Sequence, residues 1–271
     1  MKIQKSKIGT IFNLDADCRC LDKAVELGLE CAEVCSWNVP LNTPERARLL
    51  KQRAADKGVR ITTLWAGVSG PASWTFTEGP LTLGVVPVQY REQRVKELCA
   101  WADFAAEAGA PAIVTHCGFL PENMTDPDYP AVVEALRTVA EKCLSVGVGF
   151  WFETGQETPV TLLRFIEAIG TPNLGINLDP GNLTMYGRGN AVDALYTFGK
   201  HVKSLHVKDG FPPAKGTELG HETKVGEGSV DFSTLVKKLF ELGFDGDFTI
   251  EREVKNNEKD ILDTVAFLLA L

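Results

Sequence analysis

The chain has 271 residues, with 28 Lys and Arg against 36 Asp and Glu, a formal net charge of −8 and 44% hydrophobic residues. This composition is typical of a globular protein, and the acidic balance argues against nucleic acid as the main partner, because affinity for a duplex depends on clustered Lys and Arg. No uncharged apolar run reaches the roughly 18 residues that a membrane span needs, so we expect no membrane partner and a cytoplasmic location. The seven cysteines include no Cys-x-x-Cys pair, which disfavours a disulfide framework or a zinc finger.

Short apolar runs alternate with amphipathic segments along the chain, a pattern typical of βα units and a parallel sheet. The expected strands cover residues 8–13, 31–37, 59–66, 111–117, 148–153, 174–179, 202–208 and 247–253. Eight such units in 271 residues match the size of a closed barrel. The predicted fold class is therefore α/β, a single (β/α)8 TIM barrel formed by one domain of residues 1–271.

Two segments are longer than the minimal pattern requires. Residues 68–89 and 210–230 are rich in Gly and Pro, and we interpret them as loop insertions after the third and the seventh strand. Barrel enzymes place their active sites at the C-terminal ends of the strands, so both loops flank the expected site. The first, with Trp74, is a candidate lid or contact surface of a possible homo-oligomer. The second, with Lys215 and Lys224, is a weaker candidate for holding a phosphate.

The last four predicted strands each end in a polar residue on the inward face. Alternation of side chains along a strand directs Glu153, Asp179, His206 and Glu251 toward the mouth of the barrel. Three carboxylates and one imidazole at such close range require a compensating positive charge. A divalent cation is the simplest source, and oxygen-rich ligation with one His favours Mn²⁺, with Mg²⁺, Co²⁺ or Zn²⁺ as alternatives. We therefore predict a metal site formed by these four side chains.

The segments around these residues resemble the sugar phosphate isomerase/epimerase family of xylose-isomerase-like TIM barrels. The resemblance is carried by residues 152–155, 177–183, 205–210, 225–232 and 249–253. It implies the barrel fold and the same four metal ligands. In ketose epimerases of this family the first and the last carboxylate also act as the acid/base pair, which here are Glu153 and Glu251. The chain departs from the ketose 3-epimerases at Asn182, where those enzymes usually have His.

The resemblance and the predicted metal site together favour proton abstraction next to a carbonyl. We expect a metal-dependent isomerase or epimerase that acts through an enediolate on a small-molecule carbohydrate, namely a sugar, keto-sugar or sugar phosphate. The same first step also serves a lyase or dehydratase, of the inosose dehydratase type or one that eliminates from a 3-keto-glycoside. A non-catalytic sugar-binding subunit is the alternative from another class. A phosphodiesterase of the apurinic endonuclease type is disfavoured by four His and the negative charge.

Further side chains are candidates for contact with the substrate. Lys208 would stabilise the enediolate oxygen or a substrate anion, or else form a salt bridge with Asp209 or Glu251. His116 lies at the end of the fourth predicted strand and points inward, so it would contact the substrate or a catalytic group, or be a core histidine. The proposed lining of the sugar pocket consists of Glu33, Trp37, Trp65 and Asn182. For Trp37 a plain core role is the alternative.

Overall fold

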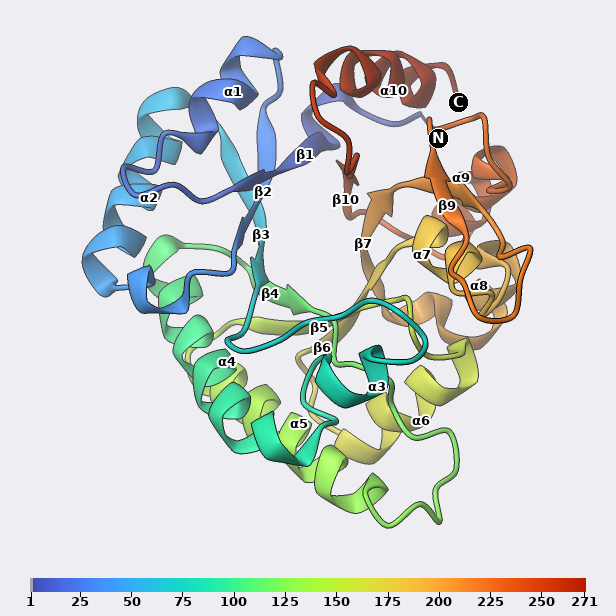
Figure 1. The fold of residues 1–271 in the computed structure, drawn as a ribbon. Coiled ribbons are helices and arrows are strands. Elements are labelled where there is room, and N and C mark those ends of the chain that lie inside the picture. Colours follow the sequence, from blue (N-terminus) through green and yellow to red (C-terminus); the bar gives the residue numbers. More distant parts are fainter. Residues whose placement is uncertain (1) are drawn as a thin grey trace.

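The computed structural model describes residues 2–271 and contains a closed barrel of eight parallel strands (Figure 1). The strands are β1 (Ile8–Asn13), β2 (Cys31–Ser36), β3 (Arg60–Ala66), β4 (Ala112–Thr115), β5 (Gly149–Glu153), β6 (Leu174–Leu178), β7 (Val202–Val207) and β10 (Asp247–Ile250). Neighbours in the barrel follow the chain order, and β10 pairs with β1 to close the ring. Each strand lies within its predicted range, so the predicted (β/α)8 TIM barrel is confirmed.

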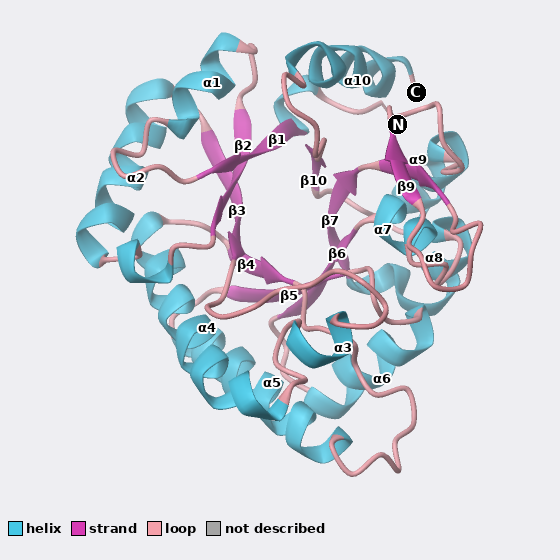
Figure 2. Ribbon diagram, viewed as in Figure 1, coloured by secondary structure: helices cyan, strands magenta, loops and turns pink. Residues whose placement is uncertain are grey.

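Helices cover the outside of the barrel (Figure 2). They are α1 (Cys20–Glu26), α2 (Pro44–Lys57), α4 (Val88–Ala108), α5 (Tyr129–Ser145), α6 (Pro159–Ile169), α7 (Pro180–Met185), α8 (Ala191–Phe198), α9 (Phe232–Glu241) and α10 (Glu258–Ala270). The hydroxyls of Thr43 and Thr158 accept hydrogen bonds from backbone N–H groups at the starts of α2 and α6, each of which begins with Pro. Within residues 2–271, no helix has both the length and the apolar character of a membrane span.

The two long segments contain regular structure, which differs from the predicted loops. Residues 68–89 include the short helix α3 (Gly79–Thr82). The second segment forms a hairpin of β8 (Asp209–Phe211), which begins one residue before it, and β9 (His221–Thr223). The guanidinium of buried Arg94 orders the first segment by donating to the carbonyls of Thr82 and Gly84 at 2.6 and 2.7 Å. A contact between residues that are far apart in the sequence leaves no mark in the local pattern of Gly, Pro and apolar residues. That pattern therefore predicts that a segment is inserted, but not the structure it adopts.

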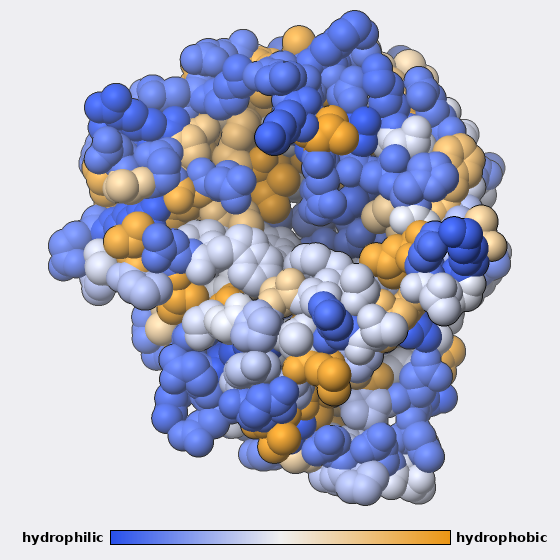
Figure 3. All heavy atoms as spheres, in the orientation of Figure 1, coloured by the Kyte–Doolittle hydropathy of each residue, from blue (hydrophilic) through white to orange (hydrophobic). Residues whose placement is uncertain are grey.

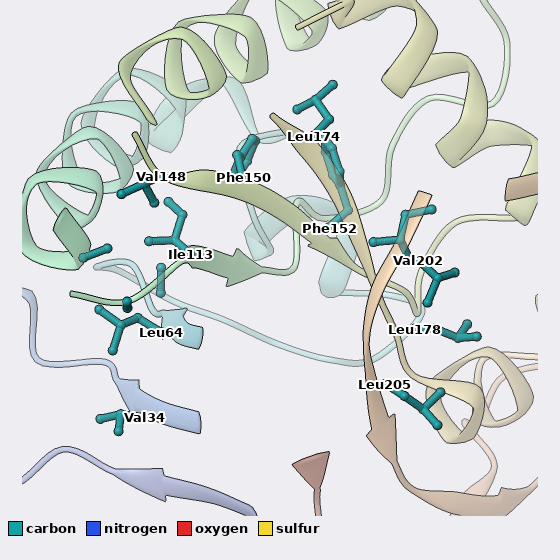
Figure 4. Close-up of a cluster of buried hydrophobic side chains, with 14 of the residues drawn as sticks. Val34, Leu64, Ile113, Val148, Phe150, Phe152, Leu174, Leu178, Val202 and Leu205 are labelled. Carbon is teal, nitrogen blue, oxygen red and sulfur yellow. The ribbon is translucent and has the colours of Figure 1, made fainter. Parts of the chain in front are cut away.

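The core has two layers separated by the strands. Outward-facing side chains pack between the barrel and the helices, and Figure 4 shows ten of them on β2 to β7 and the turns that precede them. A smaller inner cluster consists of Cys35, Trp65 and Val114, with Ile11 and Trp151 packed against it. Because inward positions alternate with outward ones, the polar residues that follow this inner cluster along the strands lie at the C-terminal mouth.

Candidate active site

Four side chains from four neighbouring strands converge at the mouth of the barrel. Glu153 ends β5, Asp179 follows β6, His206 lies in β7 and Glu251 follows β10. Each offers one ligand atom, and these atoms all lie within 4.8 Å of one another. Local structure fixes one of them, because a carboxylate oxygen of Asp179 accepts the backbone N–H of Asn182 at 2.8 Å and so caps α7. The alternation of side chains along the strands thus brings together the four residues predicted to bind a metal.

His206 lies at the centre of this cluster and is fully buried. Its Nδ1 lies 3.0 Å from Oε2 of Glu251 and 3.2 Å from Oε1 of Glu153. On the other side of the ring, Nε2 lies 2.9 Å from Oε1 of Glu33. Burial favours the neutral imidazole, but the charges of Glu33, Glu153 and Glu251 outweigh it and hold the pKa of His206 well above its usual range. The cluster therefore favours a positive charge at its centre.

The carboxylate oxygens that face this centre fit a divalent cation. Oδ2 of Asp179 and Oε2 of Glu251 are buried and accept no hydrogen bond among the described residues, although a buried carboxylate oxygen normally has a partner. Burial also raises the pKa of Asp179 to about 7, against the lowering effect of the nearby His206 imidazole and the charge of Lys208. Three carboxylates and one imidazole suit a cation such as Mn²⁺ or Mg²⁺. The side chains present therefore match the chemistry of the implied metal.

Three of the other predicted site residues contact Glu153. Nε1 of Trp65 donates to one carboxylate oxygen of Glu153. The second oxygen lies 3.1 Å from Nε2 of His116 and 3.2 Å from Nδ2 of Asn182. Burial favours the neutral acid, but His116 and His206 outweigh it and hold the pKa of Glu153 well below its usual range. The surrounding donors therefore hold this carboxylate in one orientation and in its charged form.

Lys208 is buried beside the same cluster and lines the cavity above it. Its ammonium lies 3.0 Å from Oε1 of Glu253 and 3.4 Å from Oε1 of Glu251. Of the two salt bridges predicted for Lys208, the one with Glu251 is confirmed. The pairing with Asp209 is wrong, because the Asp209 carboxylate instead accepts backbone N–H groups of the 210–230 segment, including that of Gly226 at 3.0 Å. Lys208 thus places a positive charge between two glutamates at the edge of the site.

A cavity of about 670 Å³ opens above the cluster, and Figure 3 shows a hollow near the centre of this face. Seven of the predicted site residues line it: Trp37, Trp65, His116, Glu153, Asn182, Lys208 and Glu251. Trp37 is 42% exposed, so a plain core role for it is wrong. Trp74, in the loop that was expected to flank the site, also lines it. The prediction missed lining residues from the first strand, from the end of α7 and from the 210–230 segment, among them Asn13, Met185, Tyr186 and Leu219. Only Asn13, which ends a predicted strand, had a local signal.

Glu33 is not among the residues that line the cavity. It is fully buried one inward position below Cys35, where it accepts hydrogen bonds from Thr63 and, at 2.9 Å, from Nε2 of His206. The structure therefore places it behind a predicted metal ligand, whereas the sequence analysis placed it against the sugar.

The two lysines expected to hold a phosphate are both paired. Lys215 lies 2.9 Å from Glu218, and Lys224 lies 2.9 Å from Asp260. Neither residue lines the cavity above the carboxylate cluster. The 210–230 segment therefore does not supply a pair of free cations next to the site.

Comparison with known proteins agrees with this geometry. A crystal structure of a xylose isomerase domain protein from Planctomyces limnophilus superposes with a TM-score of 0.92 at 32% sequence identity, covering 98% of this chain and 97% of that one. Inosose dehydratase of Geobacillus kaustophilus is 25% identical over an alignment of 192 residues, and the match covers 60% of this chain and 62% of the relative. Ketose 3-epimerase of Arthrobacter globiformis is 24% identical over an alignment of 163 residues, and the match covers 55% of this chain and 52% of the relative.

The matches to curated relatives are partial, since this chain spans between 52% and 62% of the length of each. The family match is broader and covers both the fold and the site. A model described as "Xylose isomerase-like TIM barrel" matches residues 21–271, a range that includes all four residues of the carboxylate and histidine cluster. The chain therefore belongs to the xylose isomerase-like TIM barrel family.

Proposed function

We propose that the protein is a divalent-metal-dependent isomerase or epimerase that removes a proton next to the carbonyl of a carbohydrate. The observation that supports this most is the cluster of Glu153, Asp179, His206 and Glu251, whose ligand atoms lie within 4.8 Å of one another. Two of these residues, Glu153 and Glu251, line a cavity open to solvent. A cation held by these residues would polarise the carbonyl and the neighbouring hydroxyl of a substrate. A ketose 3-epimerase among the relatives is consistent with this reaction class.

Glu153 and Glu251 are the proposed acid/base pair. They extend from β5 and β10, which are separated in the barrel by β6 and β7, so their carboxylates approach the cavity from two directions. In an epimerisation, one carboxylate removes the proton at the carbon beside the carbonyl and the other delivers a proton to the opposite face. His116 and Asn182 hold Glu153 in place, and the ammonium of Lys208 would stabilise the negative charge that develops on the substrate oxygen.

A dehydratase or lyase is the second candidate. It is favoured by the relative inosose dehydratase, which matches 60% of this chain. Both reactions begin with the same removal of a proton and differ in whether a neighbouring substituent then leaves. Asn182 separates this chain from the usual ketose 3-epimerase pattern, so the second step has to be determined by experiment.

The test is isotope exchange with the Mn²⁺-loaded protein in D₂O, using ketoses, ketose phosphates and inososes. Deuterium at a stereocentre without loss of water identifies an epimerase, migration of the carbonyl identifies an isomerase, and an unsaturated product identifies a lyase. We expect Glu153→Gln and Glu251→Gln each to abolish turnover, and Glu141→Gln, at an exposed carboxylate on α5, to leave it unchanged. Full exchange in both of the first two variants would refute the assigned roles.

A further inference from the structure

A second cavity lies at the other end of the barrel from the candidate active site. It has a volume of about 310 Å³ and is lined by the segments that lead into β7 and β10, by the start of β7 and by Trp151 of β5. Segments that lead from a helix into a strand lie at the N-terminal face of a barrel, whereas active sites lie at the C-terminal face. A ligand in the second cavity would therefore leave the candidate active site open.

Trp151 gives the second cavity an aromatic wall. It faces inward two positions before Glu153 on β5, and it packs against the inner cluster of the barrel. Two glycines make room for its ring, because a Cβ on Gly149 would lie 2.6 Å from Nε1 and a Cβ on Gly175 would lie 2.6 Å from Cδ1. The Nε1–H of Trp151 donates no hydrogen bond to any residue from 2 to 271. The ring thus offers an apolar face and an unpaired donor.

Two cations line the cavity with this ring. Lys200 lies in the single turn Gly199–His201 before β7, and Lys203 is the second residue of β7. The Cβ position on Gly175 that would lie 2.6 Å from Cδ1 of Trp151 would lie equally close to Cγ of Lys203, so the lysine stem and the indole approach the same point. Neither ammonium forms a salt bridge within residues 2–271. Both lysines are therefore free to pair with a ligand.

The negative charge nearest to these lysines has a cation of its own. Asp245 contributes the carboxylate among the described residues that line the cavity. Its side chain is 94% exposed and lies 3.4 Å from the ammonium of Lys7, which also donates to the Asp245 carbonyl at 2.7 Å. Burial and the charges of Lys200 and Lys203 lower the pKa of the neighbouring His201. The second cavity is thus locally positive, although the chain as a whole carries a charge of −8.

The rest of the wall is largely apolar and includes Val202, Leu242 and Phe244. An inorganic anion would leave these side chains and the indole without a contact, whereas an organic anion with a flat or apolar part would cover them. The volume lies at the lower end of the roughly 300–1,000 Å³ typical of small-molecule sites, which suits a single ring with its acidic group.

We propose that the second cavity is a binding site for a small organic anion. Its carboxylate or phosphate would pair with Lys200 and Lys203, and its aromatic or apolar part would cover Trp151. The site goes beyond the proposed function and is independent of it, because no metal ligand and no residue of the cavity above the cluster contributes to its wall.

Calorimetry with the Mg²⁺-loaded protein tests this site. Benzoate and phenyl phosphate carry both expected groups, benzamide and phenol lack the charge, and acetate and inorganic phosphate lack the ring. At least one of the two aromatic acids should bind about tenfold more tightly than its uncharged counterpart, a ratio on the order of what two exposed ion pairs contribute. The acid with the higher affinity identifies the acidic group. The proposal is overturned if benzamide and phenol bind as tightly as the two aromatic acids, or if acetate and inorganic phosphate do.

Charge-removing variants test the location of the acidic group. Lys200→Gln and Lys203→Gln should each weaken binding of the tighter acid about threefold, and together about tenfold, while the affinity of the uncharged compound stays the same. Lys237→Gln, at an exposed lysine of α9 outside the cavity, should change none of these affinities. Wild-type affinity for the acid in the double variant would place it at the metal cluster or elsewhere, and the proposal would fail.

NMR tests the location of the ring. The Nε1–H signal of Trp151, identified by its absence in Trp151→Phe, should shift as the acid is added over the concentrations at which calorimetry shows binding. The signal of Trp37, which lines the cavity above the cluster and is identified in the same way, should stay in place. A shift of the Trp37 signal alone would put the acid in the candidate active site and overturn the proposal, whatever the outcome of the deuterium-exchange experiment.

Discussion

The carboxylate of Glu33 lies 2.9 Å from Nε2 of His206, while Nδ1 of the same ring faces Glu153, Asp179 and Glu251. A carboxylate behind a metal-binding histidine fixes which ring nitrogen carries the proton and how the ring is oriented. Here Glu33 accepts the Nε2 proton, which leaves Nδ1 directed into the cluster. Because both side chains are fully buried, water does not compete for this contact.

Glu33 should therefore be a positioning residue for the metal. Replacing the partner behind a ligand typically costs 10–100-fold in metal affinity, so we expect a loss of about this size in Glu33→Ala when Mn²⁺ binding is measured by calorimetry. Glu33→Gln keeps a hydrogen-bond acceptor, so it should lose less Mn²⁺ affinity than Glu33→Ala. Thr63→Val removes the second contact of Glu33, so its Mn²⁺ affinity should lie between those of wild type and Glu33→Ala. ¹⁵N NMR of the imidazole should show a mixed tautomer in Glu33→Ala, and wild-type affinity and tautomer in that variant would refute the role.

Metal binding should also stabilise the fold. A ligand that binds only the folded state at 100 times its dissociation constant adds about 2.7 kcal/mol, so Mn²⁺ should raise the thermal midpoint and EDTA should reverse the change. Asp179→Asn removes one carboxylate charge from the cluster but can still cap α7. This variant should therefore fold, and Mn²⁺ should no longer raise its thermal midpoint. In Asp193→Asn, at an exposed residue of α8, Mn²⁺ should still raise the midpoint as in wild type. An equal shift in Asp179→Asn would place the metal elsewhere.

The sequence predicted the strands and the four clustered residues because both follow from one local rule. Alternation along a strand determines which side chains face inward, and it assigned Glu153 and His206 correctly without knowledge of the neighbouring strands. How deep an inward-facing side chain lies along the barrel axis depends instead on the stagger between neighbouring strands. The position of Glu33, below the cavity rather than on its wall, could therefore not be predicted from its own strand.

The cavity residues that lie outside the barrel strands had no comparable signal. Met185 and Leu219 reach the cavity only because α7 and the β8–β9 hairpin pack against each other, with Gly220 N–H donating to the Met185 carbonyl at 2.8 Å. The resemblance to a family suggested the proposed reaction class but not these contacts. These parts of the cavity wall thus depend on long-range contacts that composition and periodicity do not encode.

The hairpin itself should depend on Asp209. This buried carboxylate accepts the backbone N–H groups of Gly210, Gly226, Gly228 and Val230 at 2.8 to 3.1 Å. Hydrogen bonds to charged groups contribute about 1.5–3 kcal/mol each, and they are not additive. Asp209→Ala should therefore lower the free energy of unfolding by about 3 kcal/mol, measured by urea denaturation. It should also speed proteolysis within residues 212–220.

Two glycine substitutions in the 210–230 segment, one beside Asp209 and one away from it, test whether Asp209 holds this segment. A Cβ at Gly228 would lie 2.1 Å from Oδ1 of Asp209, whereas a Cβ at Gly216 would meet nothing within 4 Å. We expect Gly228→Ala to reproduce the loosened hairpin of Asp209→Ala and Gly216→Ala to behave as wild type toward the protease. Equal cleavage rates in the two glycine variants would show that Asp209 does not hold the segment.

Glu157 should make stability fall as the pH rises. The side chain is 4% exposed, and its Oε1 has no hydrogen-bond partner among the described residues. Burial raises the pKa of Glu157 from 4.5 to about 7, against the charge of His116. Below pH 4.5 both the folded and the unfolded chain carry the proton. Between pH 4.5 and 7 unfolding releases it, so the folded state loses stability with rising pH, and above pH 7 the loss is complete.

Replacing this carboxylate by an amide removes the titration. Raising the pKa of Glu157 from 4.5 to about 7 costs the charged folded state about 3 kcal/mol. The stability advantage of Glu157→Gln over wild type should therefore grow by about 2–3 kcal/mol from about pH 5 to about pH 8. The measurement is urea denaturation of both proteins across this range with EDTA present, which keeps metal binding out of the comparison. Because the charge of the other carboxylates is common to both proteins, the difference between the two curves isolates Glu157. A difference that is constant with pH, or that grows toward acid, would show that the folded protein holds Glu157 in its charged form.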